Sequence, residues 1–154
     1  ISVTGVQTCA LPIYLGSSTL TFSGSGNAFA FTAATNLTFN AGTSTINFSS
    51  ASAQTLNLGS QTYNNISFTG TGAKTISGSN TFNTLSNSVQ PITVNWTAGT
   101  TQTFTNFNLS GTAGNLITNL STIPGAQYTL KKSGTWNVGA NSVDYGDNTN
   151  LFFV

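Results

Sequence analysis

The feature that most constrains the fold is a strict alternation of apolar and polar residues in short runs. Pairs of apolar residues two positions apart recur, with Thr, Ala, Asn or Ser between them: Leu20/Phe22, Phe29/Phe31, Leu37/Phe39, Ile46/Phe48, Leu56/Leu58 and Ile66/Phe68. Side chains two apart on a strand point to the same side, so each run predicts a short strand with one buried face. No window shows the apolar spacing of a helix. The sequence therefore predicts an all-β fold.

The composition excludes most functions that depend on charge. The chain has 28 Thr, 19 Ser and 19 Asn among 154 residues, but only three Lys and two Asp, and no His, Arg or Glu. Acid–base catalysis and Ser/His/Asp or Cys/His nucleophilic catalysis therefore lack the residues they need, so we expect no enzyme and no cofactor. Three lysines cannot neutralise a run of phosphates, so we expect no nucleic-acid partner. No apolar run reaches the ~20 residues of a membrane-spanning helix.

The apolar runs also repeat along the chain. A new run begins every eight to ten positions, and similar runs return after about 28 residues, a period typical of repeat folds. Three columns of stacked residues follow from this spacing: Leu37, Ile66 and Val94; Leu20, Ile46, Ile76 and Phe104; and Phe29, Leu56 and Leu85. Three interleaved columns predict three short strands per coil. We therefore expect a right-handed parallel β-helix of four to five coils, with apolar side chains filling the bore.

The N-terminal segment does not follow this alternation. Val3–Ile13 matches, at all eleven positions, the translation of a common sequencing-library adapter. A translated adapter is not part of the natural protein. We therefore expect residues 1–14 to be foreign to the fold, and residues 15–154 to form one N-terminally truncated β-solenoid domain. Cys9 is the only cysteine and lies in this segment, so the predicted domain has no disulfide.

The C-terminal tail differs from the repeats. Residues 141–150 are rich in Asn, Asp and Gly, as loops are, and the chain ends on the apolar segment Leu151–Val154. The last coil of a solenoid would otherwise expose its core, and terminal repeats are atypical for that reason. We expect residues 141–154 to cap the last coil.

A repeated five-residue segment and a segment near the C-terminus both resemble sequences of a known family. Phe39–Thr43 (Phe-Asn-Ala-Gly-Thr) returns as Trp96–Thr100 (Trp-Thr-Ala-Gly-Thr), and residues 136–149 are similar to the ending Trp-x-Ala-Gly-x-x-Ser-x-Asp-x-Gly-Asn-Asn-x-Gly-Trp of β-helix arrays. Three places depart from that ending: Val138, Asp147 and Asn150–Leu151. Residues 15–154 thus resemble pectin-lyase-like or adhesin-like solenoids of secreted bacterial, phage or metagenomic surface proteins. The resemblance implies a β-helix in an extracellular or cell-surface setting and brings no catalytic residues.

Few residues are candidates for a site. Asp144 and Asp147 form either a weak Ca²⁺ site or a turn, and we favour the turn because both residues suit turns and no third acid is near. We therefore predict no catalytic, cofactor-binding or metal site.

Asparagine and lysine positions lead to two further expectations. Asn64 and Asn65 follow Asn36 by one period of the sequence repeat. They either form a side-chain amide ladder between coils or occupy corners that tolerate Asn. We interpret Lys74 and Lys131–Lys132 as solubilising surface charge.

The sequence favours a non-enzymatic structural or adhesive solenoid module of a secreted, cell-surface or phage-fibre protein, with a glycan or another surface ligand as candidate partner. The alternative is a non-catalytic fragment of a larger β-helix carbohydrate-active protein. Ice binding by a regular Thr array is a third possibility. Against it, the sequence repeat places Gly72 and Lys74 beside Thr43 and Thr45, which interrupts the array.

Overall fold

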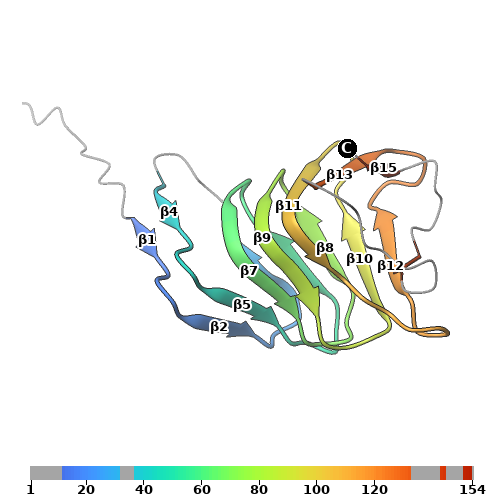
Figure 1. The fold of residues 1–154 in the computed structure, drawn as a ribbon, viewed down its shortest axis with the longest axis horizontal. Coiled ribbons are helices and arrows are strands. Elements are labelled where there is room, and N and C mark those ends of the chain that lie inside the picture. Colours follow the sequence, from blue (N-terminus) through green and yellow to red (C-terminus); the bar gives the residue numbers. More distant parts are fainter. Residues whose placement is uncertain (1–11, 32–36, 133–142, 145–150, 154) are drawn as a thin grey trace, which may run out of the picture.

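The computed structural model describes residues 12–31, 37–132, 143–144 and 151–153. These residues form a parallel β-solenoid of about 5 turns without a helix (Figure 1). The strands are β1 (Ile13–Tyr14), β2 (Thr19–Phe22), β3 (Gly26–Ala30), β4 (Phe39–Asn40), β5 (Thr45–Phe48), β6 (Gln54–Asn57), β7 (Thr62–Phe68), β8 (Lys74–Ser77), β9 (Thr81–Asn87), β10 (Ile92–Trp96), β11 (Thr101–Asn108), β12 (Ile117–Ser121), β13 (Tyr128–Lys132), β14 (Val143–Asp144) and β15 (Leu151–Phe153). The predictions of an all-β fold and of a parallel β-helix are confirmed.

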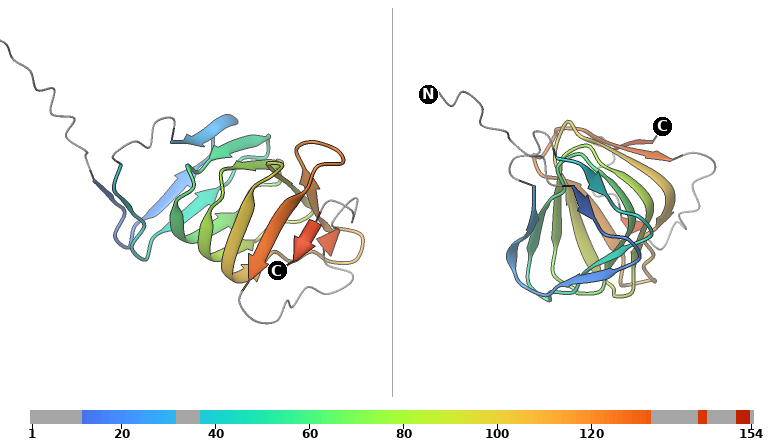
Figure 2. Two further views of the ribbon diagram at one scale, coloured as in Figure 1. Left: turned by 90° about the horizontal axis from the view of Figure 1, so that it is seen from above. Right: turned by 90° about the vertical axis from the view of Figure 1, so that its left-hand side faces the viewer.

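The strands form three parallel sheets. One has the order β14-β12-β10-β8-β6-β3, the second has the order β15-β13-β11-β9-β7-β5-β2, and the third is the pair β1-β4. Strands β7, β9 and β11 each turn a corner: Tyr63 and Ile66 of β7 are both buried although three positions separate them. The seven-stranded sheet therefore covers two sides of the solenoid, and the six-stranded sheet covers the third (Figure 2).

The bore holds the inward-facing side chains in stacked columns. The rings of Tyr63, Phe82 and Phe104 stack with centroid distances of 6.0 and 5.3 Å. Ile46, Ile66, Leu85 and Phe107 form a second column, one residue per coil, and all are buried. Burying an aliphatic or aromatic side chain stabilises a fold by roughly 1.5–3 kcal/mol, so these columns hold the coils together.

The predicted register is right for the first two coils and wrong beyond them. Leu20 pairs with Ile46 and Phe29 with Leu56, as expected. However, Ile66 pairs with Ile46 and Leu85, whereas Val94 lies in the six-stranded sheet beside Lys74 and Asn119. The predicted stacks of Leu37, Ile66 and Val94, of Ile46 with Ile76 and Phe104, and of Leu56 with Leu85 are therefore absent.

The error arises because the coils differ in length. The members of one column lie twenty-six, twenty, nineteen and twenty-two positions apart in turn: Leu20, Ile46, Ile66, Leu85 and Phe107. In the second coil the loop Ala41–Ser44 separates β4 from β5. In the next coil β7 turns the same corner without a loop, which shortens the coil.

The two ends of the described chain join the ladders. Ile13 and Tyr14, which lie before the expected domain boundary, pair with Phe39 and Asn40; residues 1–11 lie outside the described residues. At the other end β14 pairs with β12 and β15 with β13, so each of the two larger sheets gains a parallel edge strand from the tail. The rest of the expected cap, residues 141–142, 145–150 and 154, lies outside the described residues. Over the part of the chain that the structure describes, there is no helix long and apolar enough to cross a membrane.

Candidate functional site

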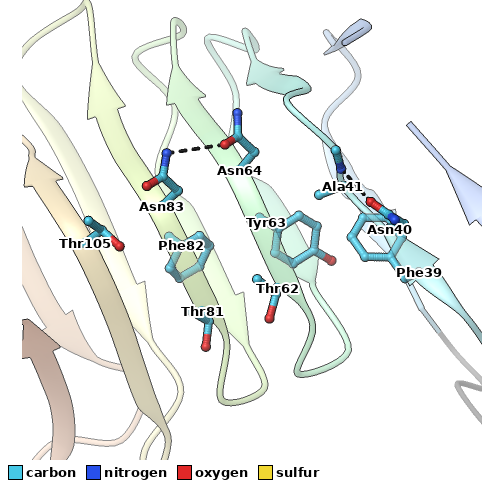
Figure 3. Close-up of a pocket in the computed structure, with 11 residues that line it drawn as sticks. Phe39, Asn40, Ala41, Thr62, Tyr63, Asn64, Thr81, Phe82, Asn83 and Thr105 are labelled. Atoms are coloured by element: carbon cyan, nitrogen blue, oxygen red, sulfur yellow. Dashed lines mark hydrogen bonds between the residues drawn. The ribbon is translucent and has the colours of Figure 1, made fainter. Parts of the chain in front are cut away.

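A groove lies between β4 and β7. The groove has a volume of about 340 Å³ and is lined by Phe39, Asn40, Ala41, Gly42, Thr62, Tyr63, Asn64, Thr81, Phe82, Asn83 and Thr105 (Figure 3). None of these residues is charged. The groove exists because, among the described residues, β4 pairs with β1 alone, while β7 pairs with β9 along its whole length.

A fork in the backbone explains this opening. The Asn65 N–H donates to the Ser44 carbonyl at 3.1 Å, and from there β5 and β7 run together. Asn64 Nδ2 donates to the same carbonyl at 3.2 Å. Upstream of this point β4 and β7 belong to separate sheets. The second and third coils are therefore paired from Ser44 onward, and before Ser44 the groove separates β4 from β7.

Short polar side chains form rows across the outer surface beside the groove. Thr62, Thr81 and Thr103 align in register on β7, β9 and β11. Asn83 Nδ2 donates to Asn64 Oδ1 at 3.3 Å, which links adjacent coils (Figure 3). These rows present neutral hydroxyls and amides at the ~4.8 Å spacing of neighbouring strands.

Ser60 and Ser79 form a further row by bonding to the next coil. Ser60 Oγ accepts a hydrogen bond from the Ser79 N–H, and Ser79 Oγ accepts one from the Thr101 N–H, both at 3.1 Å. Each hydroxyl therefore accepts a hydrogen bond from a backbone N–H of the following coil, which holds successive coils in register at this corner.

Aromatic rings form the floor of the groove. The ring centroids of Phe39 and Tyr63 are 5.1 Å apart, and Tyr63 stacks on Phe82. Tyr63 and Phe82 are buried, whereas Phe39 is half-buried. The Tyr63 hydroxyl donates to the Leu58 carbonyl at 2.7 Å, and burial raises the pKa of this phenol. The phenol is therefore a neutral structural group.

The expectation that Lys74 is surface charge is wrong, because its side chain is fully buried. Lys74 precedes Ile76 by two positions on β8, so both side chains point into the bore. Its Nζ donates to the carbonyls of Ser50, Gly70 and Gly72 at 3.3, 3.2 and 2.5 Å. Burial lowers the Lys74 pKa to about 8. The ammonium therefore holds a corner of the coil together.

The other predicted positions have mixed outcomes. Lys131 is exposed, as expected. The expected amide ladder from Asn36 to Asn64 and Asn65 involves Asn36, which lies outside the described residues; Asn64 instead accepts a hydrogen bond from Asn83 of the next coil. Asp144 lies on β14 beside Thr118, and Asp147 lies outside the described residues. Within the described ranges there is no group of three or more His, Cys, Asp or Glu side chains that could hold a metal ion.

Sequence reasoning missed a set of inward-facing polar residues. Gln54 Nε2 donates to the carbonyls of Phe22 and Gly24 at 3.0 and 2.8 Å. Asn119 Oδ1 accepts from Trp96 Nε1 at 2.9 Å. All such residues lie two positions from a buried apolar residue on the same strand: Gln54, Lys74, Gln102 and Asn119. This spacing of two positions, which places both side chains on the same face of a strand, is the sequence feature that could have identified them.

Comparisons with known proteins found no matching family model, no matching curated protein and no matching solved structure.

Proposed function

We propose that this chain is a non-enzymatic β-solenoid module that serves as a structural and adhesive segment of a secreted, cell-surface or phage-fibre protein. The observation that carries the proposal is the set of in-register polar rows beside the groove, above all Thr62, Thr81 and Thr103. The stacked bore supports the structural part of the role, because each coil contacts only its neighbours and a solenoid therefore forms an elongated, continuous surface.

The chemistry of the rows favours a neutral, hydroxyl-rich ligand. Hydroxyls and amides both donate and accept hydrogen bonds, and no charge in the groove would attract an ion. The partly exposed Phe39 ring adds an apolar surface at the groove floor. A neutral glycan combines hydroxyl edges with apolar faces, and it is the ligand class that we assign to this surface.

A panel of immobilised neutral glycans tests the adhesive role. We expect the double substitution Thr81→Ala and Asn83→Ala to weaken glycan binding by about tenfold or more, since two hydrogen bonds of about 1 kcal/mol are lost. The matched control is Thr55→Ala with Thr75→Ala, an in-register outward pair on the six-stranded sheet, which should leave binding unchanged. Equal loss in both variants, or no binding by the wild-type chain, would contradict the proposal.

The corrected register favours ice binding as a second candidate function. The sequence argument against it placed Gly72 and Lys74 beside Thr43 and Thr45, but Thr45 pairs with Asn65. Thr62, Thr81 and Thr103 instead form a real row, which ends at Lys131 on β13. We expect Thr81→Lys to abolish any thermal hysteresis, and a wild-type chain without thermal hysteresis eliminates this candidate.

A further inference from the structure

The edge of β4 that faces the groove is not paired. On the opposite edge, the Ile13 N–H donates to the Thr38 carbonyl at 2.8 Å and the Leu15 N–H donates to the Asn40 carbonyl at 2.9 Å. Thr38 and Asn40 therefore point their backbone groups toward β1. Because alternate residues of a strand point to opposite edges, the N–H and C=O of Phe39 point toward β7.

The facing edge of β7 is open in the same way. The Thr81 N–H donates to the Gln61 carbonyl at 3.0 Å, so Gln61 points toward β9. Thr62 is the next residue, so its N–H and C=O point toward β4. Within the described ranges, the backbone groups of Phe39 and Thr62 that face the groove have no hydrogen-bond partner.

Two open strand edges therefore face each other across one groove. We infer that this groove is a strand-addition site, which takes up a short extended segment of another polypeptide and pairs it with Thr62 on one side and Phe39 on the other. An extended chain has N–H and C=O groups on both of its edges at the strand period. It can therefore supply hydrogen-bond partners to Phe39 and Thr62 at the same time. The inference goes beyond glycan adhesion, since the ligand is a peptide backbone.

The lining also defines the side chains of this partner. The groove is uncharged, so a neutral segment meets no desolvated charge. Its inward side chains lie above the Phe39 and Tyr63 rings, whose centroids are 5.1 Å apart, so they must be small. Its outward side chains lie beside Thr62 and Asn64 and should be polar. Alternating Ala and Thr satisfies both requirements.

Admitting such a strand requires β4 to move outward. A strand paired on both sides needs neighbours roughly 9.6 Å apart. The two-residue ladder with β1 is the only sheet pairing of β4 within the described residues, so β4 is the element that can shift. We therefore expect weak binding, driven by a few hydrogen bonds of about 1 kcal/mol each.

An NMR titration of the full chain tests the site. The probe is a capped peptide of alternating Thr and Ala, and the control peptide carries N-methyl groups on alternate residues. We expect the amide signals of Phe39 and Thr62 to shift and the Thr62 N–H to gain protection from exchange. Thr62→Ala keeps the backbone donor and removes only the hydroxyl, so its loss of affinity should be smaller than that of a variant without the donor. Thr62→Pro removes it and should weaken binding about fivefold.

Several outcomes would overturn the inference. The Thr62 N–H lies outside the β7–β9 ladder, so the Thr62→Pro chain should keep its dispersed spectrum. Equal binding by that folded variant, or by the N-methylated peptide, excludes backbone pairing. Absence of shifts at millimolar peptide excludes the site. If a neutral oligosaccharide shifts the same amides and the peptide does not, the groove is a glycan site and the strand proposal fails while the adhesive role stands.

Discussion

The first coil and the fourth coil are built from the same alternation, yet their inward side chains are buried to different extents. Phe22, Phe29 and Phe31 in the first coil are half-buried, whereas Phe82 and Leu85 of the fourth are fully buried. The coils also become shorter between these two regions, as the spacing of the paired residues shows. Two causes therefore act: β2 and β3 are edge strands of their sheets in the described structure, and the longer corner of the second coil leaves β4 and β7 unpaired.

The corner between Phe39 and Ile46 shows the cause. Six residues separate these inward side chains, whereas only Asn64 and Asn65 separate Tyr63 from Ile66. The longer corner carries β4 away from β7, and the groove results. The groove is thus a consequence of chain length at one corner, whereas the exposure of the first coil follows from its place at the edge of both sheets.

The largest difference should appear in the bore. Phe82→Ala removes a buried ring stacked between Tyr63 and Phe104, and we expect a loss of about 3–5 kcal/mol in the free energy of unfolding. Phe31→Ala removes a half-buried ring, and we expect about 1–2 kcal/mol. Urea unfolding of both variants measures this. Equal losses would mean that the first coil is packed as tightly as the fourth.

Lys74 should make stability depend on pH. Its pKa is lowered to about 8 in the fold, so between pH 8 and its ordinary value of 10.5 the unfolded chain binds more protons. The free energy of unfolding should therefore rise with pH, by up to about 3 kcal/mol. Tyr63 has a raised pKa, so its ionisation in the unfolded chain makes stability fall above pH ~10.

The second-coil counterpart of Lys74 provides the matched control. Gln54 occupies the same column as Lys74 one coil earlier, without a charge. Lys74→Gln should therefore remove the rise between pH 8 and 10 and keep the fall above it. Thermal melts across pH 7–11 measure both. An unchanged rise in the Lys74→Gln chain would assign the titration to another group.

Glycines at equivalent corners should respond differently to a methyl group. A Cβ on Gly72 would lie 2.0 Å from the Ser52 carbonyl oxygen, so Gly72→Ala should cost about 1–3 kcal/mol. A Cβ on Gly24, at the same corner of the first coil, meets nothing within 4 Å. Gly24→Ala should therefore change stability by less than about 0.5 kcal/mol in thermal unfolding. A large cost at Gly24 would contradict the open first coil.

These contrasts also show what the sequence could and could not predict. Alternation identified the inward residues of single strands, because side-chain direction is a local property: Ile46, Phe48, Ile66 and Phe68 are all buried. Register is not local. Leu37-Thr38-Phe39 resembles Ile66-Ser67-Phe68, yet Ile66 pairs with Ile46, because short runs look alike and only corner lengths decide which ones stack.

The candidate site was harder to predict for the same reason. Asn64 was expected to stack on Asn36 by the sequence period, whereas its hydrogen bond in the structure is to Asn83. The groove, however, exists because β4 and β7 do not pair. The alternation of apolar and polar residues predicts strands, but it does not show which neighbouring strands fail to pair. Lys74 was predicted to be exposed because it is charged, although its position two residues before Ile76 placed it on the inward face of the strand.

The prediction with the smallest expected effect on stability concerns a deletion that makes the corner after Phe39 as short as the corner in β7. Deleting residues 40–43 leaves two residues between Phe39 and Ile46, as in β7, so the shortened strand should pair with β7 and close the groove. Global stability should change by less than about 1 kcal/mol, because new backbone hydrogen bonds offset those lost, such as Thr43 N–H to the Gly16 carbonyl. Exchange of the Thr62 amide should slow about tenfold, while the Tyr63 amide, which faces β9, serves as the internal control. A Thr62 amide that stays unprotected would show that something other than corner length holds the two strands apart.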